Sequence, residues 1–193
     1  QRDKVADGPG RTGTEDPGVG QGADTVFSQM AAETLHMDIS RVHIVTQQDT
    51  DVTPFDTGAY ASRQSFVTGT AVKECAQQLK QKILEYARTL VPGNVDRLEL
   101  EDGYILADGK PAISLEDLAM ESYYSLSNSS VLTAEVSRQV KKNTVASGCC
   151  FAEVEVDMKL GKIKVLDIVN VHDSGTLLNP QLAAMQVHGG MFM

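Results

Sequence analysis

The stretch "RQSFVTGTAVKECAQQLKQKILEYARTL" (residues 63–90) decides the fold, because it predicts one long helix around which a domain can pack. Its apolar residues recur at the spacing of a single helical face. These residues are Val67, Ala71, Val72, Cys75, Leu79, Ile83, Ala87 and Leu90. Ser62 is the candidate N-cap, and Pro92 and Gly93 end the pattern. We therefore expect a long helix with one side buried against other elements.

The segment before this helix predicts a loop, a shorter helix and a strand. Residues 1–20 are rich in Gly, Asp, Pro and Arg without periodicity, which is typical of a loop. A second helical pattern begins at Ala23. Its apolar positions are Val26, Met30, Ala31 and Leu35. The stretch "RVHIVTQQ" (residues 41–48) alternates apolar and polar residues and predicts a strand, and residues 49–60 predict a loop.

The segment after the long helix predicts a hairpin, a short helix and a loop. The stretch "RLELEDGYILADGKP" (residues 97–111) contains Asp-Gly pairs, which are the signal of tight hairpin turns. Ser114 is the candidate N-cap of a short helix that reaches Tyr123. Residues 125–147 are polar and rich in serine, so we expect a surface loop there.

The C-terminal part predicts a pair of strands and a last helix. The stretches "CFAEVEVDM" (residues 150–158) and "KIKVLDIVNVHD" (residues 162–173) alternate apolar and polar residues on either side of a turn. Asn179 opens a helical pattern that Gly189 and Gly190 are expected to break. Helices and strands come in blocks without a βαβ repeat, so we expect an α+β fold in which the long helix packs on short β ribbons.

Composition excludes several classes of function. The 193 residues include 17 basic and 26 acidic side chains, a formal net charge of −9, so the chain lacks the basic surface that binds nucleic acid. No apolar run reaches the roughly 20 residues of a membrane helix, and the N-terminus does not resemble a signal peptide. The three cysteines lack the spacing of a disulfide framework or a metal site, which indicates a reducing, cytoplasmic location.

Both ends of the sequence predict an incomplete domain. The chain does not begin with Met, and it ends on the apolar residues "MFM". We expect a fragment with an irregular N-terminal segment, residues 1–19, and a partial cofactor-binding domain, residues 20–193.

Three stretches join polar residues to glycine or to a helix start: "GQGADT" (residues 20–25), "GAYASRQS" (residues 58–65) and "NPQLAAMQVHGG" (residues 179–190). In the first two, free backbone N–H groups and the positive end of a helix dipole can hold an anion. Glutamine side chains donate and accept hydrogen bonds at once, which suits a heterocyclic amide. Each stretch alone is also typical of a capped turn or an ordinary helix start. Together they predict a phosphate-bearing ligand rather than acid–base catalysis.

The other candidate motifs are weaker. The sequence has no nucleophile elbow, P-loop or Rossmann fingerprint. The stretch "VHD" (residues 171–173) is either an acid–base pair or an anchor for the following turn, and we favour the anchor. His43 is interpreted as a packed or edge residue of its strand. The stretch "DTD" (residues 49–51) lacks the rest of a calcium loop, so we interpret it as a solvated loop.

Longer versions of these stretches resemble the molybdenum-binding subunit of bacterial xanthine dehydrogenases, in the molybdenum hydroxylase family. They are "GQGADTVFSQMAAETL" (residues 20–35), "QDTDVTPFDTGAYASRQSFVTG" (residues 48–69) and "VEVDMKLGKIKVLDIVNVHDSGTLLNPQLAAMQVHGGM" (residues 154–191). Their order and spacing also fit the family, and the likeness covers residues 18–193. It implies a fragment of the molybdopterin-binding domain.

The resemblance implies a redox function for the intact enzyme. Family members hydroxylate purines or other heterocycles at a molybdenum centre, with water as the oxygen source, and the xanthine dehydrogenase branch implies xanthine or hypoxanthine as the substrate. Electrons pass through iron–sulfur clusters and FAD, held on partner subunits, to NAD. The pterin holds the molybdenum, so the resemblance implies no metal ligand from the protein.

The resemblance also implies which residues contact the cofactor. They are Gly20, Gln21, Gly22, Ala61, Ser62, Arg63, Gln64 and Gln186. The family's catalytic Glu lies in a motif beyond the end of this chain, so no catalytic residue is expected and the fragment alone should be inactive. The stretch "RTGTEDPGVGQG" (residues 11–22) departs from the family pattern by the extra Asp16 and Pro17.

Two alternatives stay open at this point. The intact enzyme could be a related hydroxylase that acts on another heterocycle or on an aldehyde. The chain could instead be an inactive fragment that serves only as a binding or structural module.

Overall fold

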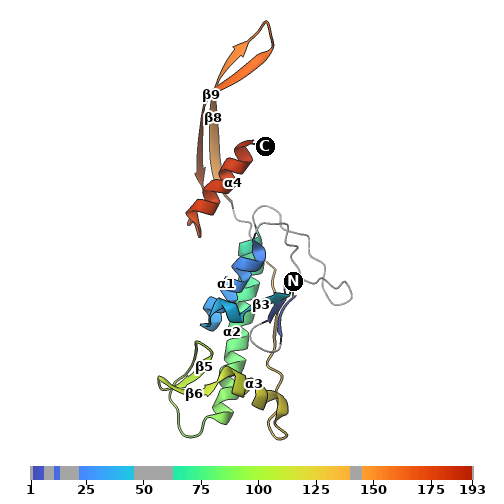
Figure 1. The fold of residues 1–193 in the computed structure, drawn as a ribbon, viewed down its shortest axis with the longest axis vertical. Helices are drawn as coiled ribbons and strands as arrows, with labels where there is room; N and C mark the ends of the chain where they lie inside the picture. The colour runs from blue at the N-terminus through green and yellow to red at the C-terminus, as the bar shows by residue number, and fades with distance from the viewer. Residues whose placement is uncertain (1, 7–10, 14–21, 46–62, 140–144, 193) are drawn as a thin grey trace, which may run out of the picture. The chain divides into compact units, whose positions relative to one another are not determined.

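The computed structural model describes residues 2–6, 11–13, 22–45, 63–139 and 145–192. These residues form two compact units, Gln1–Asn143 and Thr144–Met193 (Figure 1). Each unit has its own secondary structure.

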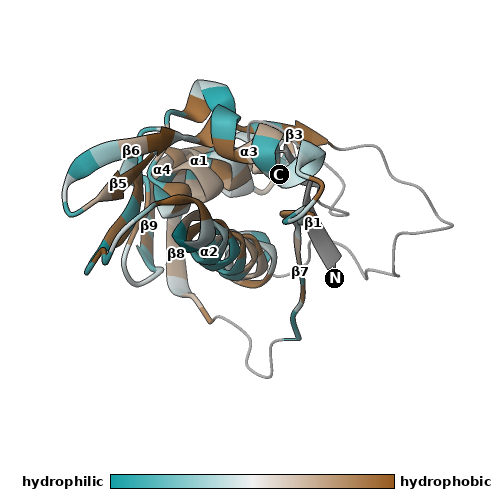
Figure 2. Cartoon of the chain, turned by 90° about the horizontal axis from the view of Figure 1, so that it is seen from below, coloured by the Kyte–Doolittle hydropathy of each residue, from teal (hydrophilic) through white to brown (hydrophobic). Residues whose placement is uncertain are grey.

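Two helices, α1 (Ala23–Leu35) and α2 (Gln64–Leu90), form the centre of the first unit (Figure 1). Helix α2 buries most of its predicted apolar face, and Figure 2 shows hydrophobic and hydrophilic residues alternating around it. Helix α1 buries Ala31 and Leu35 as predicted, whereas Val26 and Met30 are only half-buried, and Phe27, which was not among the predicted positions, is fully buried. The side chains buried on the two helices include Phe27, Ala31, Leu35, Val72, Cys75, Leu79 and Ile83. The long helix is therefore confirmed, and its apolar stripe lies in the core.

The two helices run in the same direction. Near the start of α2 and the middle of α1, a Cβ built on Gly69 would lie 2.7 Å from Sδ of Met30 and 3.9 Å from Cε1 of Phe27. Farther along each helix, Nζ of Lys80 donates to the carbonyl oxygen of Thr34 at 3.5 Å. Contacts that advance together along both chains define a parallel pair. Because Gly69 has no side chain, Met30 fits against the backbone of α2.

A four-stranded sheet packs against α2 in the same unit. Its strands, in spatial order, are β3 (His43–Val45), β2 (Arg11–Gly13), β1 (Arg2–Ala6) and β7 (Ala134–Ser137). Strand β1 is antiparallel to both of its neighbours, whereas β2 and β3 are parallel. Helix α2 contacts β1 and β7, so the sheet closes one side of the core.

A three-stranded meander follows α2: β4 (Leu98–Glu101), β5 (Tyr104–Ala107) and β6 (Lys110–Ser114). In the first turn, Asp102 and Gly103 have φ angles of 46° and 79°. In the second turn, Asp108 and Gly109 have φ angles of 48° and 79°. Two consecutive positive φ angles define the hairpin turn that Asp-Gly favours. The Asp-Gly prediction is confirmed, although the segment forms three strands rather than a pair.

Two shorter helices complete the first unit. Helix α3 (Leu115–Tyr124) begins at the predicted cap, because Oγ of Ser114 accepts a hydrogen bond from the backbone N–H of Asp117 at 3.0 Å. Its Leu118 is fully buried. A 3₁₀ helix, η1 (Ile39–Arg41), links α1 to β3.

The second unit consists of a long antiparallel hairpin and a helix. Strands β8 (Ser147–Asp157) and β9 (Lys162–Asp173) pair along their whole length, with Phe151 opposite Val169. Helix α4 (Pro180–Phe192) follows. The prediction of a strand pair and a last helix is confirmed.

Three features of the secondary structure differ from the expectations. Strands β1 and β2 lie within residues 1–20, and β7 lies within residues 125–147, where loops were expected. Each is short and pairs with a segment distant in sequence, so no local alternation marks it. Helix α4 continues through Gly189 and Gly190, because two glycines weaken a helix by only about 1 kcal/mol each and do not end it. The expected division at residues 19 and 20 stays a prediction.

The α1–α2 interface predicts a large loss of stability on truncation. Phe27 is 1% exposed, and its replacement by Ala removes a whole ring from the core. We expect the Phe27→Ala change to lower the free energy of unfolding by about 3–5 kcal/mol, measured by denaturant titration. Phe66 on α2 is 40% exposed and provides the matched control, with an expected loss below about 1 kcal/mol. Equal losses at the two positions would contradict the assigned interface.

Candidate functional site

The residues predicted to contact the cofactor fall into three groups. Gly20, Gln21, Ala61 and Ser62 lie outside the described residues. Gly22 caps α1, Arg63 occupies the capping position of α2, and Gln64 is the first residue of α2. Gln186 lies on α4, in the second unit, with its side chain exposed.

The start of α1 is open and uncapped by a side chain. Gly22 adopts a left-handed conformation with φ of 81°, and its carbonyl oxygen accepts the first helical hydrogen bond from the N–H of Val26 at 3.1 Å. A Cβ at Gly22 would meet no heavy atom within 4 Å. Glycine has no side chain to accept hydrogen bonds from the first-turn N–H groups, so the cap residue itself does not satisfy them. A ligand with acceptor oxygens can take them.

The start of α2 also lacks a side-chain cap, although its N-cap residue is an arginine rather than a glycine. The carbonyl oxygen of Arg63 accepts from the N–H of Val67 at 2.7 Å, and its guanidinium carries only donors. It therefore cannot satisfy the first-turn N–H groups, and it adds a positive charge beside them. The side chain of Gln64 is half-buried, with its amide Nε2 shielded from solvent. The first turn of α2 contains no acidic residue.

Both helix starts lie at the same end of the α1–α2 pair, because the two helices are parallel. Each N-terminus carries a partial charge of about +0.5 from the helix dipole. Each of these helix starts by itself favours the binding of an anion such as phosphate. Asp24 in the first turn of α1 opposes this field in part. The arrangement can bind an anion and a hydrogen-bonding ring, and it contains no described nucleophile or general base.

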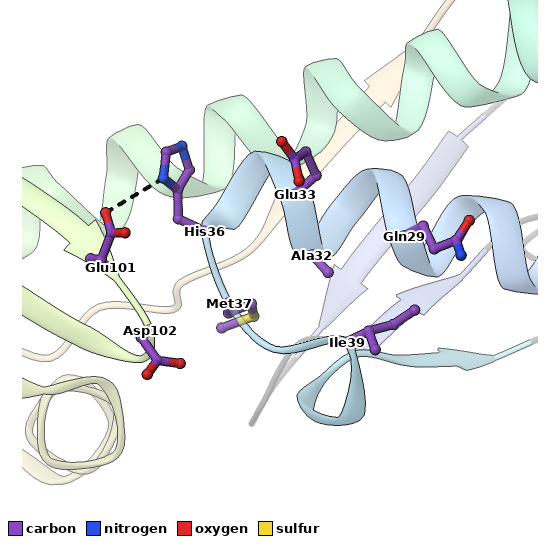
Figure 3. A pocket seen from close by; sticks show the side chains of 8 residues that line it. All are labelled: Gln29, Ala32, Glu33, His36, Met37, Ile39, Glu101 and Asp102. Carbon is purple, nitrogen blue, oxygen red and sulfur yellow. Dashed lines mark ion pairs between the residues drawn. The ribbon is translucent and has the colours of Figure 1, made fainter. Parts of the chain in front are cut away.

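A pocket of about 500 Å³ lies at the opposite end of α1 (Figure 3). Its lining includes Gln29, Glu33, His36, Ile39, Glu101 and Asp102. Nδ1 of His36 lies 3.6 Å from Oε2 of Glu101. At about 1.5 Å per residue, the lining extends from roughly 10 Å beyond Gly22, at Gln29, to roughly 20 Å, at the end of α1.

Its chemistry is the reverse of that at the helix starts. The carboxylates of Glu33, Glu101 and Asp102 and the negative end of the α1 dipole repel an anion. The pocket is therefore not part of the anion site. The sequence did not reveal it, because it joins the end of α1 to the β4–β5 turn, which lies far along the chain. Only the acidic Glu101-Asp102 pair at a hairpin turn hinted at a charged surface.

The weaker motifs resolve toward structural roles where the structure describes them. Oδ1 of Asp173 accepts from the N–H of Gly175 at 2.9 Å, so this aspartate anchors the turn as expected. His43 is exposed on β3. The stretch 49–51 lies outside the described residues. Within the described ranges no three His, Cys, Asp or Glu side chains come together as a metal site, and no helix is long and apolar enough to cross a membrane.

Comparison with known proteins identifies one family. The model of the molybdopterin cofactor-binding domain matches residues 11–193. The match covers both units and all the predicted site residues.

Known relatives and solved structures agree with this match. The chain is 47% identical over 178 residues to the putative xanthine dehydrogenase molybdenum-binding subunit XdhA of Escherichia coli K12, covering 91% of this chain and 24% of that protein. It is 32% identical over 171 residues to the probable hypoxanthine oxidase XdhD of the same strain, covering 89% of this chain and 18% of that protein. Its fold matches the crystal structure of quinoline 2-oxidoreductase from Pseudomonas putida 86 with a TM-score of 0.74 at 24% identity. The match covers 98% of this chain and 25% of that one. The chain thus spans about a quarter of the length of such proteins.

The left-handed conformation of Gly22 allows a test of the anion site with an internal control. Gly22 and Gly109 have φ angles of 81° and 79°, and neither has a neighbour that a Cβ would meet. Replacing either by Ala should lower the free energy of unfolding by about 1–2 kcal/mol through backbone strain alone. In the full-length polypeptide, only the Gly22→Ala change should also lower the phosphate released from a bound cofactor on denaturation. Equal phosphate contents in the two variants would remove Gly22 from the site.

Proposed function

The chain belongs to the family of molybdopterin cofactor-binding domains, and from this premise we propose that it forms part of the molybdenum subunit of a xanthine dehydrogenase-type hydroxylase. The identity of 47% to the Escherichia coli molybdenum-binding subunit supports this branch of the family over more distant ones. Because the chain spans 24% of that protein, the activity belongs to a longer polypeptide. The role of these residues is to hold the cofactor.

The described residues fit the cofactor on physical grounds. The N-cap residues of α1 and α2 make no side-chain capping hydrogen bond, so the first-turn N–H groups of both helices are candidate donors to the phosphate of a molybdopterin. The open space at Gly22 leaves room for a ligand to approach the backbone. This convergence of two helix starts is the observation that carries the proposal.

Each site residue then has a distinct role. We assign Gly20 and Gly22 to a close approach between backbone and cofactor, and Gln21 and Gln64 to hydrogen bonds with its pterin ring. We assign Ala61, Ser62 and Arg63 to contacts with the phosphate and Gln186 to a contact with the pterin. When bound, the molybdenum cofactor supplies the redox centre for hydroxylation of a heterocycle. The residues of this chain orient the cofactor and contribute no proton transfer.

The proposal extends to the whole enzyme. We infer xanthine or hypoxanthine as the substrate, water as the oxygen source, and partner subunits with iron–sulfur clusters and FAD that pass electrons to NAD. The word "subunit" in the name of the Escherichia coli relative supports a multi-subunit enzyme. We place the enzyme in the cytoplasm, with support from the odd number of cysteines.

The glutamines provide the sharpest test of cofactor binding. In the full-length polypeptide, each of the changes Gln21→Ala, Gln64→Ala and Gln186→Ala removes a side chain that hydrogen-bonds the pterin. We expect each change to weaken the affinity for the cofactor at least about tenfold, which is the loss expected when polar groups of a ligand are left unpaired. The natively purified enzyme should then contain less molybdenum, measured by elemental analysis.

Gln77 serves as the matched control, because it lies on α2 like Gln64 but has an exposed side chain away from the helix start. The Gln77→Ala enzyme should keep its full molybdenum content. Wild-type enzyme that contains neither molybdenum nor pterin would overturn the proposed function, and unchanged molybdenum in Gln64→Ala would overturn the role of that residue.

A further inference from the structure

Gly69 lies inside a helix, where a glycine is unfavourable. It is the only glycine of α2, it follows the first turn of that helix, and it is buried. Glycine has a lower helix propensity than any residue except proline, so it weakens the early part of α2. The missing side chain therefore needs a reason in the packing, and the close approach of a neighbouring element is such a reason.

The neighbouring element is α1, which lies beside α2 (Figure 1). A Cβ built on Gly69 would lie 2.7 Å from Sδ and 3.0 Å from Cε of Met30, so the end of this thioether occupies the place of a side chain on α2. The Phe27 ring follows at 3.9 Å and is 1% exposed. On α2, the nearby Thr68 and Val72 are also buried. The contact is thus internal to the first unit and does not depend on the rest of a longer polypeptide.

The contact lies close to both helix starts. Gly22 comes eight residues before Met30, and Gln64 comes five residues before Gly69. At about 1.5 Å per residue, the two starts lie about 12 Å and about 8 Å from the contact, both toward the same end because the helices are parallel. The axes of packed helices are about 8–10 Å apart, and the side chains at the contact set this distance. The packing at Gly69 therefore controls how far apart the two starts lie.

We propose that Gly69 is a positioning residue for the cofactor, because its missing side chain lets α1 and α2 approach and so sets the spacing between their first turns. The inference rests on the proposed function, in which both helix starts contact one molybdopterin. Donor and acceptor atoms of an N–H···O hydrogen bond lie about 2.7–3.2 Å apart, so a ligand that contacts both starts tolerates little change in their spacing. Gly69 acts through the positions of Gly22 and Gln64 rather than by touching the cofactor.

Side chains of graded size at position 69 change this spacing by different amounts. In Gly69→Ala, the flexible end of Met30 can move aside, so the helices keep their spacing. In Gly69→Val, two further carbons enter the same space, and Met30 cannot retreat toward Phe27 because that ring is buried. The helices must then separate near their starts. Helix α2 itself persists in both variants, since alanine and valine have higher helix propensities than glycine.

The test measures molybdenum and pterin per folded polypeptide, and the melting temperature, for the natively purified full-length enzyme. Gly69→Ala should keep the wild-type cofactor content. Gly69→Val should weaken the affinity for the cofactor at least about tenfold, the loss expected when a polar group of a ligand is left unpaired, and should contain less molybdenum and pterin. The double change of Met30→Ala with Gly69→Val gives the space of the thioether to the new side chain and should restore the cofactor content. If Gly69→Val yields no folded polypeptide, Gly69→Ser takes its place and should show a smaller loss of the same kind.

Leu79 provides the matched control, because it is buried on α2 but lies ten residues beyond Gly69, away from the helix starts. Leu79→Ala should lower the melting temperature at least as much as Gly69→Val and leave the cofactor content of the folded polypeptide unchanged. Wild-type cofactor content in Gly69→Val would overturn the inference. So would an equal loss in Leu79→Ala, which would make the loss one of stability, or no recovery in the double variant. Wild-type enzyme without molybdenum or pterin would instead overturn the proposed function, and the role of Gly69 with it.

Discussion

The parallel contact between α1 and α2, made where Met30 packs against Gly69, is the constraint on which the rest of the first unit depends. It allows one core to form from both helices, the meander and β7. It also brings the two helix starts to one end, where their dipoles add rather than cancel. An antiparallel pair would bury the same apolar area and would separate Gly22 from Arg63 by the length of α1. Packing and cofactor binding therefore rest on the same geometric choice.

Features of the fold that depend on neighbouring residues were predictable from the sequence. Asp102-Gly103 and Asp108-Gly109 make their turns through backbone preferences that need no distant partner, and Ser114 caps α3 through its own hydroxyl. Strands β1 and β7 were missed because each gains its structure from pairing with the other across most of the first unit. The prediction for helix α4 made the opposite error. The low helix propensity of Gly189 and Gly190 was expected to break the helix, but the helix continues to Phe192.

The class of ligand was predictable from the sequence, whereas the arrangement of the helices was not. Glycines and glutamines beside helix starts indicated an anionic, hydrogen-bonding ligand, and the family match agrees. No pattern in the sequence gives the relative direction of α1 and α2, because periodicity defines which face is buried and not which way the neighbour runs. The acidic pocket beside His36 was missed for a related reason, since its two walls come from α1 and from the β4–β5 turn.

The pairing of β1 with β7 has a consequence for how the chain acquires its structure. The meander and α3 connect residues close in sequence, so their loops close at little entropic cost and can form early. Arg2 finds its partner only in Ser137, so β1 must wait until nearly the whole first unit has left the ribosome. Until then the first strand has no β7 to pair with, and its unpaired edge is open to association with other chains. Among the described strand pairs, β1–β7 thus joins the residues farthest apart in sequence, so closing its loop costs the most entropy.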